Sequence, residues 1–322
     1  MERVVEAFEV LEPGILTTVQ DLGRFGFSQV GVPPSGALDL FSLRVGNLLV
    51  SNEEGEAGLE TAIMGLKLKA MRAVVIAITG GDLFPTLNGE SLTMWRSHLL
   101  VEGDILAFKG VRQGCRAYLC IRGGVAVPKV MGSKSTFLFG RFGGFEGRAL
   151  KKGDVLHVAD LPTPLERIGG SLPSDWIPVF EKEVTLSVVP GPQDHHFTTL
   201  GFQTFRSSFY QVTAKSDRMG IRLEGPWIER RPDVEESIIS ESLVPGSIQV
   251  PGDGKPMIIL NELVTGGYSK IATIISTELP KAAQLKPGDR ARFEPISLEG
   301  AHQLLREQEE RIRRFRDILR SE

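Results

Sequence analysis

Short apolar stretches that alternate with period two, each closed by a turn, constrain the fold of this chain more than any other feature. "RAVVIAIT" (72–79) predicts a buried strand, and "CRAYLCI" (115–121) and "VTLSVV" (184–189) alternate as strands do. "TLNGESLTM" (86–94) predicts a hairpin, because Asn88-Gly89 supplies the positive φ angles of a tight turn. Glycine contributes 36 of 322 residues, above the usual share of about 7%, as expected for many short strands joined by turns.

A Gly-Asp turn that leads into a short strand recurs three times. The copies are "EGDILAF" (102–108), "KGDVLHV" (152–158) and "PGDRARF" (287–293). Two lie in the first half of the chain and one lies near the end of the second. This distribution indicates two related β modules and favours an all-β barrel architecture over a helical one.

Few helices are expected. "LDLFSLRVGNLLVS" (38–51) has apolar residues at helical spacing, with Ser35 as the predicted N-cap and Asp39 in the first turn. The tail "AHQLLREQEERIRRFRDILRSE" (301–322) predicts an amphipathic helix docked on the body or on a partner. The stretch 159–178, rich in Pro, Gly and Ser, marks a boundary. We therefore expect an N-terminal β-barrel domain (1–160), a linker (161–182), a C-terminal β-barrel domain (183–297) and a C-terminal helix (298–322).

The composition favours a soluble globular protein, with 41% hydrophobic residues and a formal charge of −3. This balance gives no reason to expect nucleic acid or an anionic membrane as a partner. The longest apolar runs, such as "AVVIAI" (73–78), are too short to span a bilayer. The first ten residues resemble no secretory signal, so a cytoplasmic location is expected. Cys115 and Cys120 would face opposite sides of one strand, which predicts two reduced packing residues.

Several familiar chemistries lack their motifs. "GSKST" (132–136) lacks the glycine that a P-loop requires five residues before its Gly-Lys step. The five histidines show no zinc-ligand spacing, so no metal is expected and surface or capping roles are favoured for them. No G-x-S-x-G elbow is present. No biotin-attachment sequence is present either, so we expect no covalently attached biotin.

Four stretches dense in glycine and polar residues remain. They are "QDLGRFGFSQVGVPPSGALD" (20–39), "GRFGGFEGR" (140–148), "AKSDRMGIRLEGP" (214–226) and "GSIQVPGDGKPMIILNELVTGGYSKIATII" (246–275). Any one of them fits a salt-bridged turn. The second also offers backbone N–H groups to an anion. Four such stretches in one chain favour a binding site.

The order and wording of these stretches resemble the biotin-dependent carboxyltransferase-like family. This family includes the C subunit of 5-oxoprolinase, the second subunit of allophanate hydrolase and the carboxyltransferase region of urea carboxylase. The matching blocks run from about residue 10 to 295 and include "EPGILTTVQDLGRFGFSQVGVPPSGALD", "GSKSTFLFGRFGGFEGRALKKGD", "PGPQDHHF", "SDRMGIRLEGP" and "IQVPGDGKP". The resemblance implies paired cyclophilin-like β-barrels with the site between them.

The resemblance also implies site residues. The opening stretch is expected to shape a cleft. The candidate substrate-binding residues are Asp21, Arg24, Ser35, Asp39, Arg141, Lys215, Arg218 and Gln249. The candidate catalytic residues are Asp217, which would orient Arg218, Tyr268 as a hydrogen-bond donor, and Lys270, which would neutralise a phosphate or an oxyanion. The chain departs from the family where relatives commonly carry Asp before "TTGGYPK", because it has Asn261 and "LVTGGYSK".

A free-standing chain of this length is most similar to the C subunit of 5-oxoprolinase. That resemblance implies ATP-driven opening of 5-oxoproline to L-glutamate, together with A-like and B-like subunits of 5-oxoprolinase as partners and with ATP in a shared site. The first alternative is a carboxyltransferase that moves CO2 from a partner's carboxybiotin to urea or a similar small amide. The second is a non-catalytic regulator that antagonises a histidine-kinase inhibitor, since likeness of fold does not fix function.

Overall fold

The computed structural model describes residues 3–162 and 168–321, and the chain forms two compact units. Unit 1 comprises the described residues of Met1–Phe25, Ser35–Val179 and Arg311–Glu322, and unit 2 comprises Gly26–Pro34 and Phe180–Glu310. The expected linker 161–182 includes residues 163–167, which lie outside the described part. No helix in the described part is long and apolar enough to cross a membrane.

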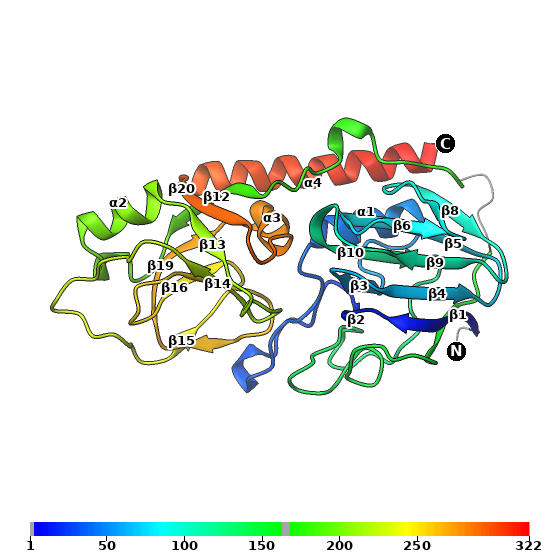
Figure 1. Cartoon of the computed structure of the whole chain (residues 1–322), viewed down its shortest axis with the longest axis horizontal. Helices are drawn as coiled ribbons and strands as arrows, with labels where there is room; N and C mark the ends of the chain where they lie inside the picture. Colours follow the sequence, from blue (N-terminus) through cyan, green and yellow to red (C-terminus); the bar gives the residue numbers. More distant parts are fainter. Residues whose placement is uncertain (1–2, 163–167, 322) are drawn as a thin grey trace. The chain divides into compact units, whose positions relative to one another are not determined.

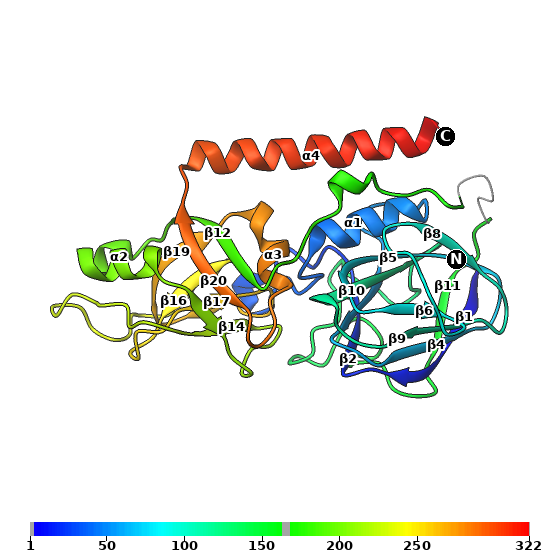
Figure 2. The same ribbon diagram turned by 45° about the horizontal axis from the view of Figure 1, so that its top comes forward.

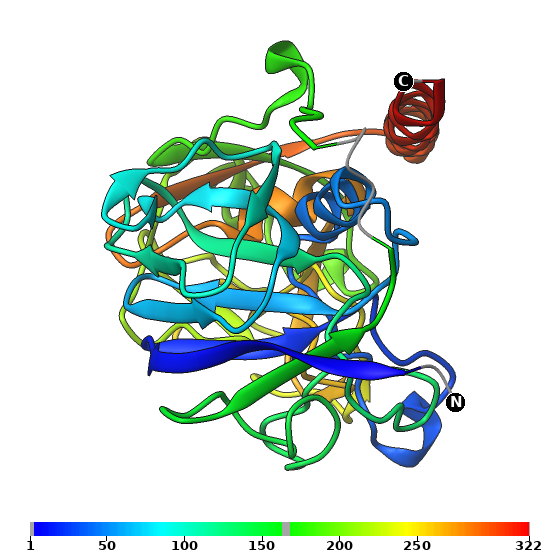
Figure 3. The same cartoon turned by 90° about the vertical axis from the view of Figure 1, so that its right-hand side faces the viewer.

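Unit 1 is built from two antiparallel sheets (Figures 1 and 3). The six-stranded sheet has the order β11 (Val155–Ala159), β1 (Val4–Pro13), β4 (Leu66–Ala70), β9 (Ile105–Phe108), β6 (Pro85–Leu87) and β7 (Glu90–Ser91). The five-stranded sheet has the order β2 (Leu16–Gln20), β3 (Gly58–Ala62), β10 (Gln113–Ile121), β5 (Val74–Asp82) and β8 (Ser97–Leu100). In Figure 3 the dark-blue β1 runs beside the green β11, its antiparallel partner.

The main core of unit 1 lies between these two sheets. Phe8 and Leu68 of the six-stranded sheet and Ile76 and Leu119 of the five-stranded sheet are fully buried in one apolar cluster. Because side chains alternate along a strand, Cys120 faces the other side of β10 and packs with helix α1 (Leu40–Leu49) in a second cluster. Both cysteines are buried and free, as the sequence predicts, and burial raises the pKa of the Cys120 thiol.

Helix α1 begins one turn later than the sequence analysis expects. The N-cap is Asp39, whose carboxylate accepts hydrogen bonds from the Ser42 backbone N–H at 2.9 Å and the Ser42 hydroxyl at 2.7 Å. The prediction of Ser35 as the cap is therefore wrong. Ser35 instead lies in a buried turn with a φ of 52°. A carboxylate at the N-cap satisfies an amide of the first turn and complements the helix dipole.

Unit 2 contains a closed barrel of seven strands (Figure 1). The order is β12 (Glu183–Pro190), β19 (Ser269–Ile274), β16 (Ser247–Val250), β17 (Met257–Ile259), β14 (Gly220–Glu224), β13 (Tyr210–Val212) and β20 (Arg290–Pro295). A short ribbon pairs β15 (Glu241–Ser242) with β18 (Thr265–Gly266). The mainly β architecture is confirmed. Two short helices, α2 (Thr199–Ser207) and α3 (Leu279–Ala283), were not predicted.

The recurring Gly-Asp motif forms the same turn in both units. The glycines have φ angles of 91°, 87° and 94° and are Gly103, Gly153 and Gly288. Each following aspartate accepts a hydrogen bond from the backbone N–H three residues earlier, and these aspartates are Asp104, Asp154 and Asp289. The turns lead into β9, β11 and β20. The predicted turn is therefore confirmed three times, as is the hairpin at Asn88-Gly89, where both φ angles are positive.

The C-terminal tail forms helix α4 (Leu298–Ser321), as predicted (Figure 2). Ile312 and Phe315, both 1% exposed, join the cluster formed by α1 and the five-stranded sheet within unit 1. Arg316 pairs with Glu54, which anchors the same end of the helix. The apolar stripe of this highly charged helix therefore docks on the body of unit 1.

We predict that Phe315→Ala lowers the free energy of unfolding by about 3–5 kcal/mol, because it leaves a cavity under α4. The matched control is Arg313→Ala on the exposed side of the same helix. This control should change the free energy of unfolding by less than about 0.5 kcal/mol. Urea denaturation of the three proteins provides the measurement, and equal effects of the two substitutions would contradict the docking.

Candidate functional site

The Asp21 carboxylate fastens the opening polar stretch to the "GSKST" segment of unit 1. Asp21 directly follows β2 and is 7% exposed. It accepts hydrogen bonds from the Ser133 hydroxyl at 2.7 Å, the Lys134 backbone N–H at 2.6 Å and the Ser135 hydroxyl at 2.5 Å. It also accepts one from the Gly23 N–H at 2.8 Å. A carboxylate engaged this fully is a structural anchor.

Arg24 connects the opening stretch and the "GSKST" segment to the loop "GRFGGFEGR" (140–148). Its guanidinium is 1% exposed, donates to the Ser135 carbonyl and lies 5.0 Å from the Phe142 ring centroid. A Cβ on Gly143 would lie 2.6 Å from Arg24 Nη2, so the glycine allows the loop to approach. The structure thus brings Asp21 and Arg24 together around residues 133–143. Arg141 of the same loop is exposed.

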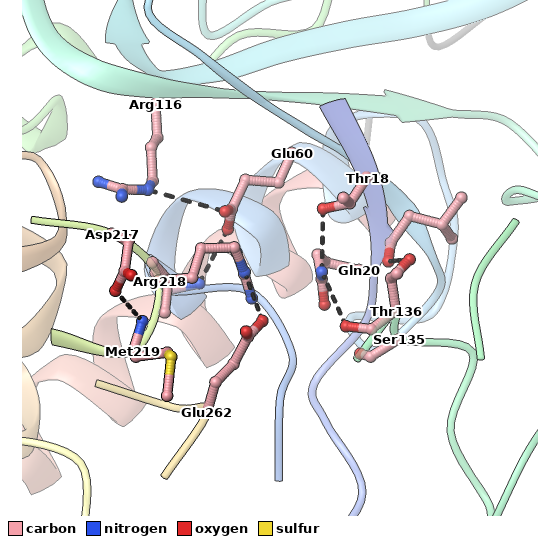
Figure 4. Close-up of polar contacts among 12 residues, drawn as sticks. Thr18, Gln20, Glu60, Arg116, Ser135, Thr136, Asp217, Arg218, Met219 and Glu262 are labelled. Carbon is pink, nitrogen blue, oxygen red and sulfur yellow. Dashed lines mark hydrogen bonds and ion pairs between the residues drawn. The ribbon is translucent and has the colours of Figure 1, made fainter. Parts of the chain in front are cut away.

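A polar row that the sequence analysis missed crosses the five-stranded sheet (Figure 4). Thr18 on β2, Glu60 on β3 and Tyr118 on β10 are direct cross-strand neighbours. Glu60 Oε2 accepts hydrogen bonds from the Tyr118 hydroxyl at 2.7 Å and from the Leu38 N–H at 3.0 Å. Arg116 Nε lies 3.7 Å from the other carboxylate oxygen.

Burial, and then the neighbouring Glu60 carboxylate, raise the pKa of Tyr118 well above its usual range, so its phenol remains protonated and donates. The same hydroxyl accepts from the Asp39 N–H at 2.8 Å, which ties the predicted residue Asp39 to the row. The sequence did contain a signal for this row. Arg116 and Tyr118 lie two residues apart in a predicted strand, so their polar side chains share one face of the sheet.

Gln20 ends this row on β2 and is completely buried. Its amide nitrogen donates to Thr18 Oγ1 at 3.0 Å and to the Thr136 carbonyl at 3.3 Å. Its Oε1 accepts no hydrogen bond from the described residues. The two acceptors fix the orientation of the amide, because a carbonyl oxygen in place of the nitrogen would face the Thr136 carbonyl.

In unit 2, the carboxylate that holds Arg218 is Glu262. Both side chains are 3% exposed, and Arg218 Nε donates to Glu262 Oε1 at 2.7 Å (Figure 4). Asp217 instead accepts hydrogen bonds from the Met219 and Gly220 backbone N–H groups at 2.8 and 3.2 Å. The predicted role of Asp217 in orienting Arg218 is therefore corrected. Glu262 was detectable as a lone carboxylate within the apolar run "PMIILNELV".

Lys270 on β19 forms the centre of a second charged cluster in unit 2. Its side chain is 5% exposed, and its ammonium donates to Glu241 Oε2 at 2.8 Å. The same oxygen accepts from the Gln193 amide at 2.8 Å. The hydrogen bonds from Lys270 and Gln193 lower the pKa of Glu241, which is therefore ionised at neutral pH. Because Glu241 is half-exposed, this pair reaches solvent.

The other predicted residues of unit 2 lie in varied surroundings. Gln249 is 2% exposed, and its amide donates to the Tyr268 carbonyl at 3.4 Å. The Tyr268 side chain is 39% exposed. Lys215 is exposed and forms no ion pair with the described residues. Gln249 on β16 is thus the cross-strand neighbour of Lys270 on β19, and Tyr268 directly precedes β19.

His196 contacts the strand residue that precedes Lys270. Its Nδ1 lies 2.9 Å from Ser269 Oγ, and Ser269 is fully buried. Burial, followed by the neighbouring His195 and Arg230, lowers the pKa of His196. The imidazole is therefore neutral at pH 7 and can exchange a hydrogen bond with a hydroxyl. The histidines were expected to be surface or capping residues, but His196 is half-buried and contacts a buried serine.

These groups suit the binding of anions and of amides. Unit 2 offers an ammonium and a guanidinium, each held in place by a carboxylate, and unit 1 offers a row of hydroxyl, carboxylate and amide groups. Positioned cations of this kind stabilise carboxylates or developing negative charge.

Comparison with known proteins identifies the family. The family model "Carboxyltransferase domain, subdomain A and B" matches residues 30–295. This chain belongs to the carboxyltransferase-domain family. The C subunit of Escherichia coli 5-oxoprolinase is 36% identical over 91% of this chain and 92% of its own length.

Other members of the carboxyltransferase-domain family are much longer. Lachancea kluyveri urea amidolyase is 37% identical over 97% of this chain, which spans only 18% of that protein. The crystal structure of the K. lactis urea amidolyase superposes with a TM-score of 0.90 and 36% identity. That match covers 96% of this chain and 20% of the other. The expected family and its β-rich fold are both confirmed.

We predict that Arg24→Ala lowers the melting temperature together with any activity, because it leaves the buried Ser135 carbonyl without the guanidinium that donates to it. The expected loss is at least about 2 kcal/mol in the free energy of unfolding. Arg141→Ala, an exposed arginine of the joined loop, is the control and should remain within about 0.5 kcal/mol of the wild type. A stable Arg24→Ala protein in thermal unfolding would overturn the structural role of Arg24.

The His196 pKa predicts a stability change in mild acid. Since the folded-state pKa lies below the usual 6.5, folding favours the neutral ring. Its contribution is complete above pH 6.5 and is lost as the pH falls through the folded-state value. His196→Gln should therefore flatten the loss of melting temperature between pH 7.5 and about 5. The control His302→Gln, on the exposed surface of α4, should keep the wild-type profile, and a steeper slope in His196→Gln would contradict this prediction.

Proposed function

We propose that this chain is the C subunit of an ATP-dependent 5-oxoprolinase, which opens the lactam of 5-oxoproline to give L-glutamate. The observation that carries the proposal is the match to the C subunit of a 5-oxoprolinase over nearly the full length of both chains. The urea amidolyases match this chain over less than a quarter of their length. The match to the C subunit covers both proteins almost completely, which favours this proposal.

The chemistry requires activation of an amide. A lactam carbonyl is a poor electrophile, so ATP first phosphorylates its oxygen and leaves as ADP. Water adds to the activated carbon and the C–N bond breaks, which gives a free amine and an acyl phosphate. A second water then displaces phosphate to give L-glutamate. In this proposal Arg218 and Lys270 bind the carboxylate of 5-oxoproline and the developing negative charge. The exposed Tyr268 donates a hydrogen bond to the same substrate. Glu262 and Glu241 act as positioning residues for the two cations.

The residues of this chain do not fit a nucleotide phosphate at "GSKST". The Lys134 backbone N–H and the Ser133 and Ser135 hydroxyls already donate to the Asp21 carboxylate. A phosphate at that place would meet a negative charge instead of free donors. We therefore place the nucleotide in a shared site of the complex, supplied mainly by the A-like and B-like partners.

The likeness to the urea amidolyase structure favours one second candidate. In that function the same cations would serve a carboxyltransferase that moves CO2 from carboxybiotin to urea or a similar small amide. This reaction requires a biotinylated partner. A streptavidin blot of co-purified proteins distinguishes the two functions.

We predict 5-oxoproline-dependent ATP hydrolysis by the complex with both partners and none by this chain alone. Size-exclusion chromatography of the chain co-expressed with its B-like partner should give one shared peak. Phosphate release with and without 5-oxoproline measures the activity. Robust hydrolysis by the isolated chain would refute the division of labour, and an inactive but intact complex would refute the function.

We also predict that Lys270→Met reduces kcat/KM of the complex by about ten- to a hundredfold, the effect of one lost charge-assisted hydrogen bond. The fold should survive, because the half-exposed Glu241 remains solvated without its partner. The matched control is Lys182→Met, an exposed lysine of the same unit. If melting temperature and activity fall in parallel, Lys270 is a structural residue only.

A further inference from the structure

A pocket of about 420 Å³ opens on unit 2 between helix α2 and strand β20. The helix contributes Gln203, Arg206 and Ser207, and the strand contributes Arg292, Glu294 and Pro295. The volume lies within the range of about 300–1,000 Å³ that is usual for small-molecule sites.

Aromatic stacking holds the two walls of this pocket in place. Phe205 of α2 stacks on Phe293 of β20, with ring centroids 4.6 Å apart and an interplanar angle of 11°. Both rings are about 1% exposed. Because side chains alternate along β20, inward Phe293 places Arg292 and Glu294 on the outer face. The charged side chains therefore stand on a rigid base.

The charges of the pocket are not neutralised by one another. Neither Arg206 nor Glu294 has a side-chain hydrogen bond or ion pair with any described residue. The Arg292 Nε donates to Thr185 Oγ1 at 2.8 Å, and its guanidinium lies 5.4 Å from the Phe209 ring centroid. No described carboxylate pairs with Arg292. The pocket thus offers two guanidinium groups and one carboxylate to a ligand.

We propose that this pocket binds an acidic α-amino acid. Arg206 and Arg292 bind its two carboxylates, since guanidinium groups favour charge-assisted pairing with carboxylates. Glu294 binds its ammonium, assisted by the negative C-terminal end of α2. Two cations and one anion in the pocket complement a ligand with two carboxylates and one ammonium. The site goes beyond the proposed function, although the product of that reaction, L-glutamate, belongs to this class.

Calorimetric titration of the purified chain with L-glutamate tests the proposal without partner proteins or ATP, so its outcome is independent of the proposed function. We expect saturable binding at concentrations below about 10 mM. Glutarate lacks the ammonium, and L-norvaline lacks the second carboxylate. Each should bind at least about tenfold more weakly, the effect of one lost charged contact. No saturation with L-glutamate would overturn the proposal.

Variants then assign the contacts. Arg206→Gln should weaken L-glutamate binding by at least about tenfold. Glu294→Gln should weaken the binding of L-glutamate and strengthen the binding of glutarate, so that the pocket prefers glutarate. Arg222→Gln, an exposed arginine on β14, is the matched control and should bind as the wild type does. Thermal unfolding confirms that each variant is folded. Unchanged L-glutamate binding in Arg206→Gln would show that no amino-acid site exists here. The same conclusion would follow if inorganic phosphate displaced L-glutamate as effectively as unlabelled L-glutamate does.

Discussion

The hydrogen bonds of the Asp21 carboxylate make the glycine-rich part of unit 1 possible. Residues 20–25, 35–39 and 130–148 of this unit contain too few apolar side chains to fold by burial, so polar contacts must hold them. Asp21 reaches donors 112 to 114 residues away in sequence, and Arg24 adds contacts to the same segment. Because removal of a shared buried partner leaves several groups unsatisfied at once, such a network imposes one conformation on the loops.

The same rule governs the charges that we assign to function. Burying a charge without a partner is costly, so each buried cation of the predicted set is held by a defined group. Arg218 has Glu262, Lys270 has Glu241, and Arg24 has backbone carbonyls. The difference lies in exposure: the half-exposed Glu241 leaves Lys270 near solvent, whereas Glu262 is as buried as Arg218. Lys270 is therefore the better placed of the two to exchange its carboxylate for a ligand.

On the outer surface of the barrel, by contrast, the charged side chains need no buried partner. Arg206, Arg292 and Glu294 are solvated, so they need no acid or base of the protein, and they gather around a pocket fixed by the Phe205–Phe293 stack. A rigid apolar base with solvated charges above it favours recognition of a small charged molecule over structural bracing. The barrel thus combines buried charges that are paired within the protein with solvated charges that can bind a ligand.

The sequence by itself determined the local features of this protein. Alternation predicts the strands, Gly-Asp and Asn88-Gly89 predict the turns, and helical spacing predicts the amphipathic helix α4, because these signals depend on residues a few positions apart. Whether that helix packs on the body or on a partner was decided by the tertiary structure, in which Ile312 and Phe315 pack on unit 1. The family resemblance followed from blocks of contiguous sequence. Only the tertiary structure decided which side chains pair with one another. It made Asp39 the N-cap of α1 in place of Ser35, and it placed Glu262 beside Arg218 in place of Asp217. It also formed the polar row through Glu60. Glu262 lies 44 residues from Arg218 and Glu60 lies 58 from Tyr118, and the choice among many carboxylates at such distances depends on which strands pair and which faces are buried.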